Sequence, residues 1–323
     1  MPSRPLPTLS ELTHFLQSFF PPPDTRNPEL PFLYHRPTTT TTPPTTPIPS
    51  ITLSITPTPA FYATLHSKPT PHLAFLHRPW TLDRKRLPQD VTVLACHQGF
   101  DENLTVGANF ALARRLGMDV DVGGGWGVVK GYKGDEGRGI GVVGGVEGGL
   151  RAALVKERVL REFGGRCEGC FGFGGRTSHE EAKEEEEGGV LLHPATASKE
   201  QDNEPITAIA IMNAFHPDEV TRALDLAASL NLISSSSTDG AKLLYLTGAI
   251  REPGLTFARD KGVRVICVGH RVCEEWGIGF LAERLREMWS GVLRVEEVYE
   301  EEEEGPREGG RRNPTQRNQP QPV

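Results

Sequence analysis

The sequence predicts an α/β protein in which strands and helices alternate around parallel sheets in two similar lobes. Short apolar runs typical of buried strands recur along the chain, and stretches with apolar residues at helical spacing lie between them. The 323 residues are enough for either one large domain or two moderate ones with a sizeable core. We place the lobes at residues 1–150 and 205–298, joined by a helix and acidic linker at 151–204 and followed by a disordered charged tail at 299–323.

The N-terminal lobe begins with a predicted helix in LSELTHFLQSFF, where Ser10 is the predicted N-cap. The Pro/Thr tract RPTTTTTPPTTPIPS (36–50) can neither hold a helix nor join a central strand, so we expect an extended, disordered insertion. Alternating or apolar runs predict strands at 50–58, 72–77 and 91–97. The last strand ends at a polar loop, QGFDEN, and LTVGANFALARRLGM then reads as a helix closed by Gly117.

The glycine-rich middle of the chain contains GIGVVG (139–144), which satisfies the G-x-G-x-x-G pattern of dinucleotide-binding proteins. That function needs a strand before the glycines and a helix that starts within them. Here the preceding GYKGDEGR is turn-like, and IGVVGGV itself reads as a strand. We therefore predict a β-segment, followed by a helix at 150–164 and by a polar, acidic linker at 177–204 that is too poor in apolar residues to fold by itself.

The C-terminal lobe shows the same alternation. Strands are predicted in ITAIAIMNA, AKLLYLTG and GVRVICVGH. Helices are predicted in PDEVTRALDLAASLNL, which has Pro217 at its start, and in IGFLAERLREMW (278–289). This order favours parallel packing in both halves of the protein.

Composition excludes several classes of function. The net charge is −7 and no basic stripe occurs, so direct binding to nucleic acid has no electrostatic support. No apolar run approaches the roughly 20 residues of a membrane span, and the first residues lack the apolar core of a secretory signal. We expect a protein of the cytoplasm, with the nucleus as a second location, and no membrane partner.

The five cysteines form an odd, scattered set, which fits a reducing compartment better than a disulfide framework. CEGC (167–170) is a CxxC pair, but a structural zinc site normally needs a second close pair, and the sequence has none. We interpret it as a glycine-rich loop with two thiols.

Three predicted strands end in polar clusters that carry candidate metal ligands. His77 ends the first, His97 and Asp101 follow the second, and His270 with Glu274 follows the third. The carboxyl ends of neighbouring parallel strands lie on one edge of a sheet, so the three clusters are predicted to converge. Taken alone, a histidine at a strand end is more often a hydrogen-bonded loop residue than a metal ligand, and a glutamate in a first helical turn is favoured simply by the helix dipole. Their joint occurrence favours a site for a divalent metal ion such as Zn, Mn, Fe or Ni.

Five blocks, in chain order, resemble a known family. They are LHRP, CHQGFD…GANFALARRLGM, GIGVVG, YLTG and VGHRVCEEWGIGFLAERL. Their order resembles the Nif-three-like family, also called GTP cyclohydrolase I type 2 homologues, whose members carry HHP, HTNxD before a helix ending in LG, GIGRIG, YLTGE and GHxxxE. The similarity runs from about residue 8 to about residue 290, and the last block is the most specific.

The resemblance implies a two-lobed α/β subunit, a ring-shaped homohexamer and a centre of two divalent metal ions facing a cleft. His77 matches the first histidine of HHP, Asp101 the aspartate of HTNxD, and His270 and Glu274 the final histidine and glutamate. These four residues are the predicted metal ligands. His97 matches the histidine of HTNxD and is the predicted catalytic residue, either as a proton carrier or as a support for the ligands.

Two positions depart from the family pattern. Arg78 stands where the second histidine of HHP is expected, and a guanidinium cannot ligate a cation. Ala249 replaces the glutamate of TGE. We therefore expect that Arg78 either substitutes its own charge for one ion or leaves a single, incomplete metal position.

Two functions are compatible with these observations. The first is a metal-dependent hydrolase that acts on a nucleotide-like substrate, as the cyclohydrolase resemblance implies. The second is a non-enzymatic, oligomeric interaction protein with a degenerate metal site and a transcription-associated partner. The retained ligands favour the first function, and the lost ligand and the polar insertions favour the second.

Overall fold

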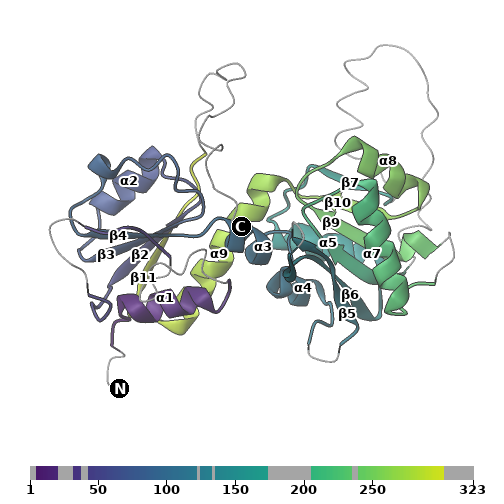
Figure 1. The fold of residues 1–323 in the computed structure, drawn as a ribbon, viewed down its shortest axis with the longest axis horizontal. Helices are drawn as coiled ribbons and strands as arrows, with labels where there is room; N and C mark the ends of the chain where they lie inside the picture. Colours follow the sequence, from purple (N-terminus) through teal and green to yellow (C-terminus); the bar gives the residue numbers. More distant parts are fainter. Residues whose placement is uncertain are drawn as a thin grey trace, which may run out of the picture.

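The protein is an α/β fold built around two separate sheets, which lie side by side in Figure 1. The computed structural model describes residues 5–20, 32–37, 43–121, 124–132, 135–173, 205–234 and 239–301. The acidic linker predicted at 177–204, the centre of the Pro/Thr tract and most of the C-terminal tail lie outside these residues. No helix within the described ranges has the length and apolar character needed to cross a membrane.

The first sheet has five strands in the order β1-β4-β3-β2-β11. Its strands are β1 (Leu33–His35), β2 (Ser50–Ser54), β3 (His72–Leu76), β4 (Val91–Ala95) and β11 (Arg294–Val298). All neighbours are parallel except β1, which runs antiparallel to β4. Helices α1 (Leu9–Gln17) and α2 (Pro59–His66) cover its opposite faces, and a short 3₁₀ turn, η1 (Arg84–Arg86), precedes β4.

The start of α1 differs from the prediction. The N-cap is Thr8, whose hydroxyl accepts from the backbone N–H of Glu11 while the Glu11 carboxylate accepts from the N–H of Thr8. This reciprocal pair is a capping box, and it satisfies two backbone donors that Ser10 would leave open. The end of the Pro/Thr tract is also ordered, since the N–H groups of Leu9 and Ile48 donate to the carbonyls of Thr46 and Pro7.

Strand β11 has no counterpart in the prediction, which assigned no element to residues 294–298. It pairs in parallel with β2 at the edge of the first sheet, directly after the last helix of the C-terminal half. Val295 and Val298 are buried on opposite faces, while the two glutamates between them hide the apolar pattern of a strand in the sequence.

The second sheet has six strands in the order β5-β6-β8-β9-β10-β7. Its strands are β5 (Trp126–Tyr132), β6 (Asp135–Arg151), β7 (Gly169–Phe171), β8 (Pro205–Ile211), β9 (Leu243–Thr247) and β10 (Arg264–Cys267). The three strands predicted in the C-terminal lobe, β8, β9 and β10, are parallel as expected, whereas β5, β6 and β7 pair antiparallel with their neighbours. The glycine-rich stretch forms the β5–β6 pair, as expected for a β-segment and not for a dinucleotide-binding turn.

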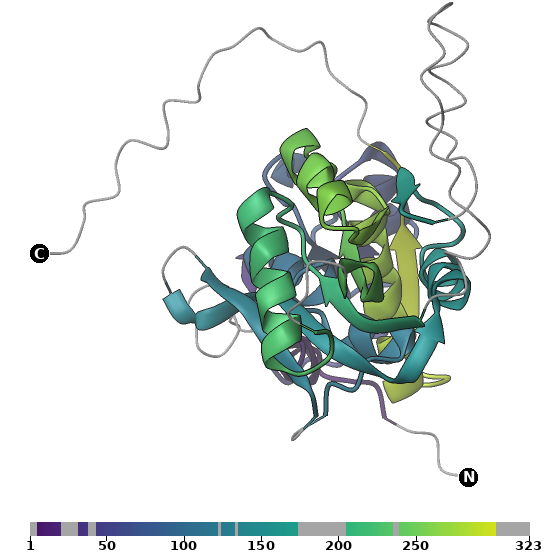
Figure 2. The same ribbon diagram turned by 90° about the vertical axis from the view of Figure 1, so that its right-hand side faces the viewer.

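Both faces of the second sheet are covered, which explains its continuous apolar strands. Residues of α7 (Pro217–Ser229) and α8 (Glu252–Asp260) pack with Ala210 and Tyr245 on one face (Figure 2). Ile209 and Leu246 belong to the opposite face, where α5 (Ala152–Glu162) packs. A short 3₁₀ helix, η3 (Asp239–Lys242), leads into β9.

Three helices lie between the sheets: α3 (Gln98–Leu104), α4 (Phe110–Leu116) and α9 (His270–Met288) (Figure 1). The segment predicted as a polar loop, QGFDEN, is helix α3. The predicted helix after it is shorter than expected and ends at Gly117, whose φ of 90° closes α4 in the left-handed conformation. Helix α9 starts eight residues before the predicted segment at 278–289 and therefore includes the whole HRVCEEW block.

The boundaries between the two sheets differ from the boundaries predicted for the two lobes. The β5–β6 pair, which was predicted to lie in the N-terminal lobe, belongs to the second sheet. Conversely, β11 closes the first sheet from the far end of the chain. Each lobe therefore contains residues from both halves of the sequence.

The contribution of β11 can be tested with two truncated chains. A chain ending at residue 293 should be less stable than one ending at residue 301, because the first exposes the edge of β2 and the apolar surface that Val295 and Val298 cover. Burial of two valines is worth about 3–6 kcal/mol. Urea unfolding of both chains measures the difference, and equal midpoints would show that β11 is not part of the stable sheet.

Candidate metal centre

His77 is the innermost residue of the site. It follows β3 directly and its side chain is fully buried, with its ring 4.5 Å from the ring of Phe100. Its Nδ1 lies 3.3 Å from the carbonyl oxygen of Cys96. A carbonyl can only accept, so Nδ1 carries the proton of that bond and Nε2 is the nitrogen available to a cation.

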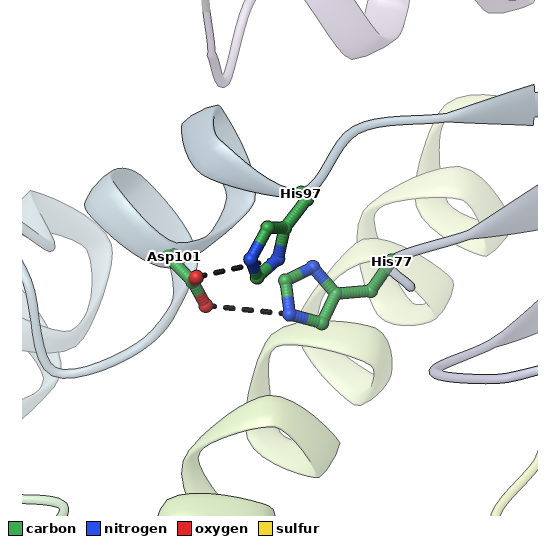
Figure 3. A group of neighbouring side chains, drawn as sticks. All are labelled: His77, His97 and Asp101. Carbon is green, nitrogen blue, oxygen red and sulfur yellow. Dashed lines mark ion pairs between the residues drawn. The ribbon is translucent and has the colours of Figure 1, made fainter. Parts of the chain in front are cut away.

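His97 and Asp101 face His77 from the start of α3. His97 is the residue that precedes the first turn of this helix, and Asp101 lies one turn further on, so both side chains lie on the same face. Asp101 Oδ1 is 3.3 Å from His77 Nε2, and Asp101 Oδ2 is 3.4 Å from His97 Nδ1 (Figure 3). One ligand atom from each of the three residues can be chosen so that all lie within 4.8 Å of one another, as in a group that could hold a metal ion.

Glu274 and His270 approach the same imidazole from α9. Gly269, with a φ of 92°, turns the chain into the helix at His270, and Glu274 follows one turn later. The Glu274 side chain is fully buried, and its Oε1 lies 3.2 Å from His77 Nε2 and 3.3 Å from His270 Nε2. Its other oxygen, Oε2, lies 3.1 Å from the Arg78 guanidinium.

These charges shift the pKa values within the cluster. Burial lowers the pKa of His77, but the carboxylates of Asp101 and Glu274 raise it by more. Glu274 also raises the pKa of His270 against the effect of burial. Burial raises the pKa of Glu274, yet His270, His77 and Arg78 bring it down to about 2, so this carboxylate is ionised at neutral pH. A proton and a cation therefore compete for the imidazoles.

Unpaired buried atoms favour a cation here. His77 Nε2, His97 Nδ1, Asp101 Oδ1 and Glu274 Oε1 are all buried without a hydrogen-bond partner. His77 Nε2 nevertheless lies at ion-pair distance from Asp101 Oδ1 and Glu274 Oε1, and His97 Nδ1 lies at ion-pair distance from the other Asp101 oxygen, Oδ2. Leaving such atoms unsatisfied costs about 1–3 kcal/mol each. Ligand atoms around a tetrahedral zinc ion lie about 3.3 Å apart, given metal–ligand distances of about 2.0–2.1 Å. The donor types fit a divalent metal ion, and the individual ion pairs of 3.2–3.4 Å are near this spacing, while the ligand atoms of His77, His97 and Asp101 as a group lie within 4.8 Å.

All five residues singled out in the sequence lie in this cluster, but the three strands that they follow do not end at one edge of a single sheet, as was expected. β3 and β4 are neighbours in the first sheet, whereas β10, which precedes His270, belongs to the second. The clusters meet because α9 lies between the sheets, not because one sheet edge holds all three strand ends. The roles of the four predicted ligands and of His97 stay predictions. Among the described residues, the group of three that could hold a metal ion is His77, His97 and Asp101, which includes His97 and omits His270 and Glu274.

Trp80 is a residue that sequence reasoning missed. Its side chain is 64% exposed, and its ring meets that of His97 edge to face at 4.7 Å between centroids. Its position in LHRPW, three residues after His77, is the sequence feature that could have identified it. An exposed tryptophan beside a polar site is a surface on which a planar ligand could stack.

Comparison with solved structures shows that the fold is known. The chain is similar to ybgI, a protein described as of unknown function, with 16% identity, coverage of 90% of this chain and 98% of the other, and a TM-score of 0.52. It is similar to reduced HcgD from Methanocaldococcus jannaschii, with 14% identity, coverage of 90% and 98%, and a TM-score of 0.50. A Bacillus cereus protein described as related to NIF3 matches with 9% identity, coverage of 91% and 97%, and a TM-score of 0.49.

No protein-family model and no curated protein matches the sequence. The likeness to the solved structures concerns the fold alone, because the sequence identities are 16% or less. It extends over nearly the full length of both chains. The two-lobed α/β fold that the Nif-three-like resemblance implied is confirmed.

The close approach of α3 to α9 positions the two halves of the cluster, and Gly277 permits it. A Cβ at Gly277 would lie 2.6 Å from the carbonyl oxygen of Leu104 and 2.6 Å from the Phe100 ring. We expect Gly277→Ala to push α3 away from α9, to cost about 1–3 kcal/mol of stability and to weaken metal binding. Chemical unfolding and metal titration measure the two effects.

Gly279→Ala, on the same helix, is the matched control. There a Cβ would meet only the ends of two side chains, the Tyr299 hydroxyl at 3.3 Å and Glu297 Oε2 at 3.8 Å. This variant should keep its metal affinity and gain up to about 1 kcal/mol from helix propensity. Equal losses in both variants would contradict the role given to the contact at Gly277.

Proposed function

We propose that the protein is a metal-dependent hydrolase with a single divalent ion per subunit, held by His77, His97 and Asp101. The observation that carries the proposal is the set of buried, unpaired nitrogen and oxygen atoms that these three side chains direct toward one another. When bound, a divalent ion would polarise a substrate group and lower the pKa of a coordinated water.

The other predicted ligands form a pair suited to proton transfer. The His270 side chain is 54% exposed, so it can exchange protons with solvent and with a substrate. Glu274, fully buried and ionised, orients the ring through Nε2 and stabilises its protonated form. A histidine with a buried carboxylate behind it is a common general acid–base arrangement. In this proposal His270 moves the proton and Glu274 positions it.

The substrate class is supported by two features beside the cluster. Trp80 offers an exposed indole face for a planar ring, and Arg78, whose side chain is one-quarter exposed, offers a fixed positive charge. Together they suit a nucleotide-like molecule with an aromatic base and anionic groups. We propose that such a molecule is the substrate.

The second candidate function is a non-enzymatic interaction protein, assembled as a homohexamer and bound to a transcription-associated partner. The observation that favours it is the ion pair between Arg78 and Glu274, which places a resident cation beside the carboxylate expected to ligate a second metal. In that case the bound ion would stabilise the subunit and would not act on a substrate.

Two isosteric variants separate these functions. Asp101→Asn removes a ligand charge and should lower metal affinity by more than about 100-fold. Glu274→Gln should retain the ion but lower the rate of metal-stimulated hydrolysis of nucleotides by about 100-fold or more, because His270 loses its partner. Metal content by elemental analysis and phosphate or base release by chromatography provide the two measurements.

Glu283→Gln is the control, because Glu283 lies on the same helix, is half-exposed and pairs with Arg115 away from the cluster. It should change neither measurement. Metal binding by the wild type with no hydrolysis of any nucleotide tested would reject the hydrolase and favour the interaction protein.

The number of ions per subunit tests the role of Arg78. We expect one tightly held ion in the wild type, since the guanidinium cannot coordinate a metal. Arg78→His should raise the stoichiometry toward two, whereas Arg78→Lys, which keeps the charge, should leave it at one. Native mass spectrometry of the intact protein reports ion number and oligomer mass together, and two tightly held ions in the wild type would refute this prediction.

A further inference from the structure

The CxxC segment lies on the edge of the second sheet and contains no residue of the metal centre. After α5 the chain turns through Gly164 and Gly165, whose φ values are 63° and 79°, and then runs along β10 as the short strand β7. Cys167 precedes this strand and Cys170 lies within it. Because β7 has three residues and pairs with β10 alone among the described strands, it can shift without breaking the sheet.

The two thiols are placed to react with each other. Their Sγ atoms lie 3.0 Å apart, and both cysteines are free. A disulfide has an S–S bond of about 2.05 Å, so the sulfur atoms need to approach by only about 1 Å. The pair is also asymmetric, because Cys167 is partly exposed whereas Cys170 is 8% exposed. One sulfur can meet a reagent from solvent, and the other lies behind it.

The surroundings give the two thiols different chemical characters. A hydrogen bond from Cys170, aided by the charge of Lys156, lowers the pKa of Cys167 to about 7, although burial opposes this. The same contact, together with burial, raises the pKa of Cys170. A partly exposed thiol of this kind is nucleophilic at neutral pH. A third thiol nearby, Cys267, donates instead to the Glu168 carboxylate at 3.2 Å.

We propose that Cys167 and Cys170 form a redox-active dithiol that small-molecule disulfides oxidise reversibly. The Cys167 thiolate attacks one sulfur of the disulfide, and a thiolate leaves and takes up a proton. The Cys170 sulfur then attacks Cys167 Sγ in the mixed disulfide, loses its proton to solvent and expels the second thiolate, which is protonated in turn. Two protein thiols are oxidised, one disulfide is reduced to two thiols, and excess thiol reverses both steps.

The reaction is tested on the full-length protein with oxidised glutathione as the probe. The reduced protein is equilibrated in buffers of different ratios of reduced to oxidised glutathione, alkylated and mapped by peptide mass spectrometry. We expect a single Cys167–Cys170 disulfide that forms and disappears with the ratio. In the reduced protein at pH 7, Cys167 should be alkylated about tenfold faster than an unperturbed thiol.

Three variants assign the roles. Cys170→Ser should accumulate glutathione on Cys167, because the second step is blocked, and Cys167→Ser should form no disulfide within the segment. Cys267→Ser is the control and should oxidise as the wild type does. The proposal is overturned if both thiols stay reduced at every ratio, if Cys170→Ser carries no glutathione on Cys167, or if Cys267 is the partner in the disulfide found. Circular dichroism of each variant verifies that it is folded.

Discussion

The contact between α3 and α9 is the constraint on which the metal centre depends. Each helix starts where a strand of a different sheet ends, and each supplies one histidine and one carboxylate to the cluster. His77 lies between the two pairs, fixed from behind by the Cys96 carbonyl. Because each helix follows a strand of a different sheet, the packing of α3 against α9 sets the ligand geometry, and a glycine at position 277 lets the backbones come close enough.

The same arrangement explains what the sequence could and could not predict. The histidines after β3 and β4 could be identified, because a polar residue that follows a buried apolar run is recognisable from the sequence alone. The contact of these residues with α9 could not be predicted, because the sequence around β10 does not indicate that this strand lies in the other sheet. Helix α3 was missed because its first six residues contain one apolar side chain, Phe100, and β11 was missed because glutamates occupy its centre. In both cases tertiary packing overrides a weak local signal.

Arg78 changes the electrostatic character of the centre. A second metal ion is an exchangeable charge that depends on supply and competes with protons, whereas a guanidinium is always present and always protonated. Its ion pair with the buried Glu274 offsets the cost of burying that carboxylate without requiring a second cation. The proposed centre therefore combines three candidate ligands for an exchangeable ion with one permanent positive charge.

The position of β11 has a consequence for the order of events at the ribosome. Strands β2, β3 and β4 are complete before residue 100 has been made, but the edge that β11 covers stays open until almost the entire chain has emerged. A parallel edge exposed for that long offers unpaired backbone groups to any neighbouring nascent chain. The sheet whose central strands are synthesised first is thus the last to receive its edge strand.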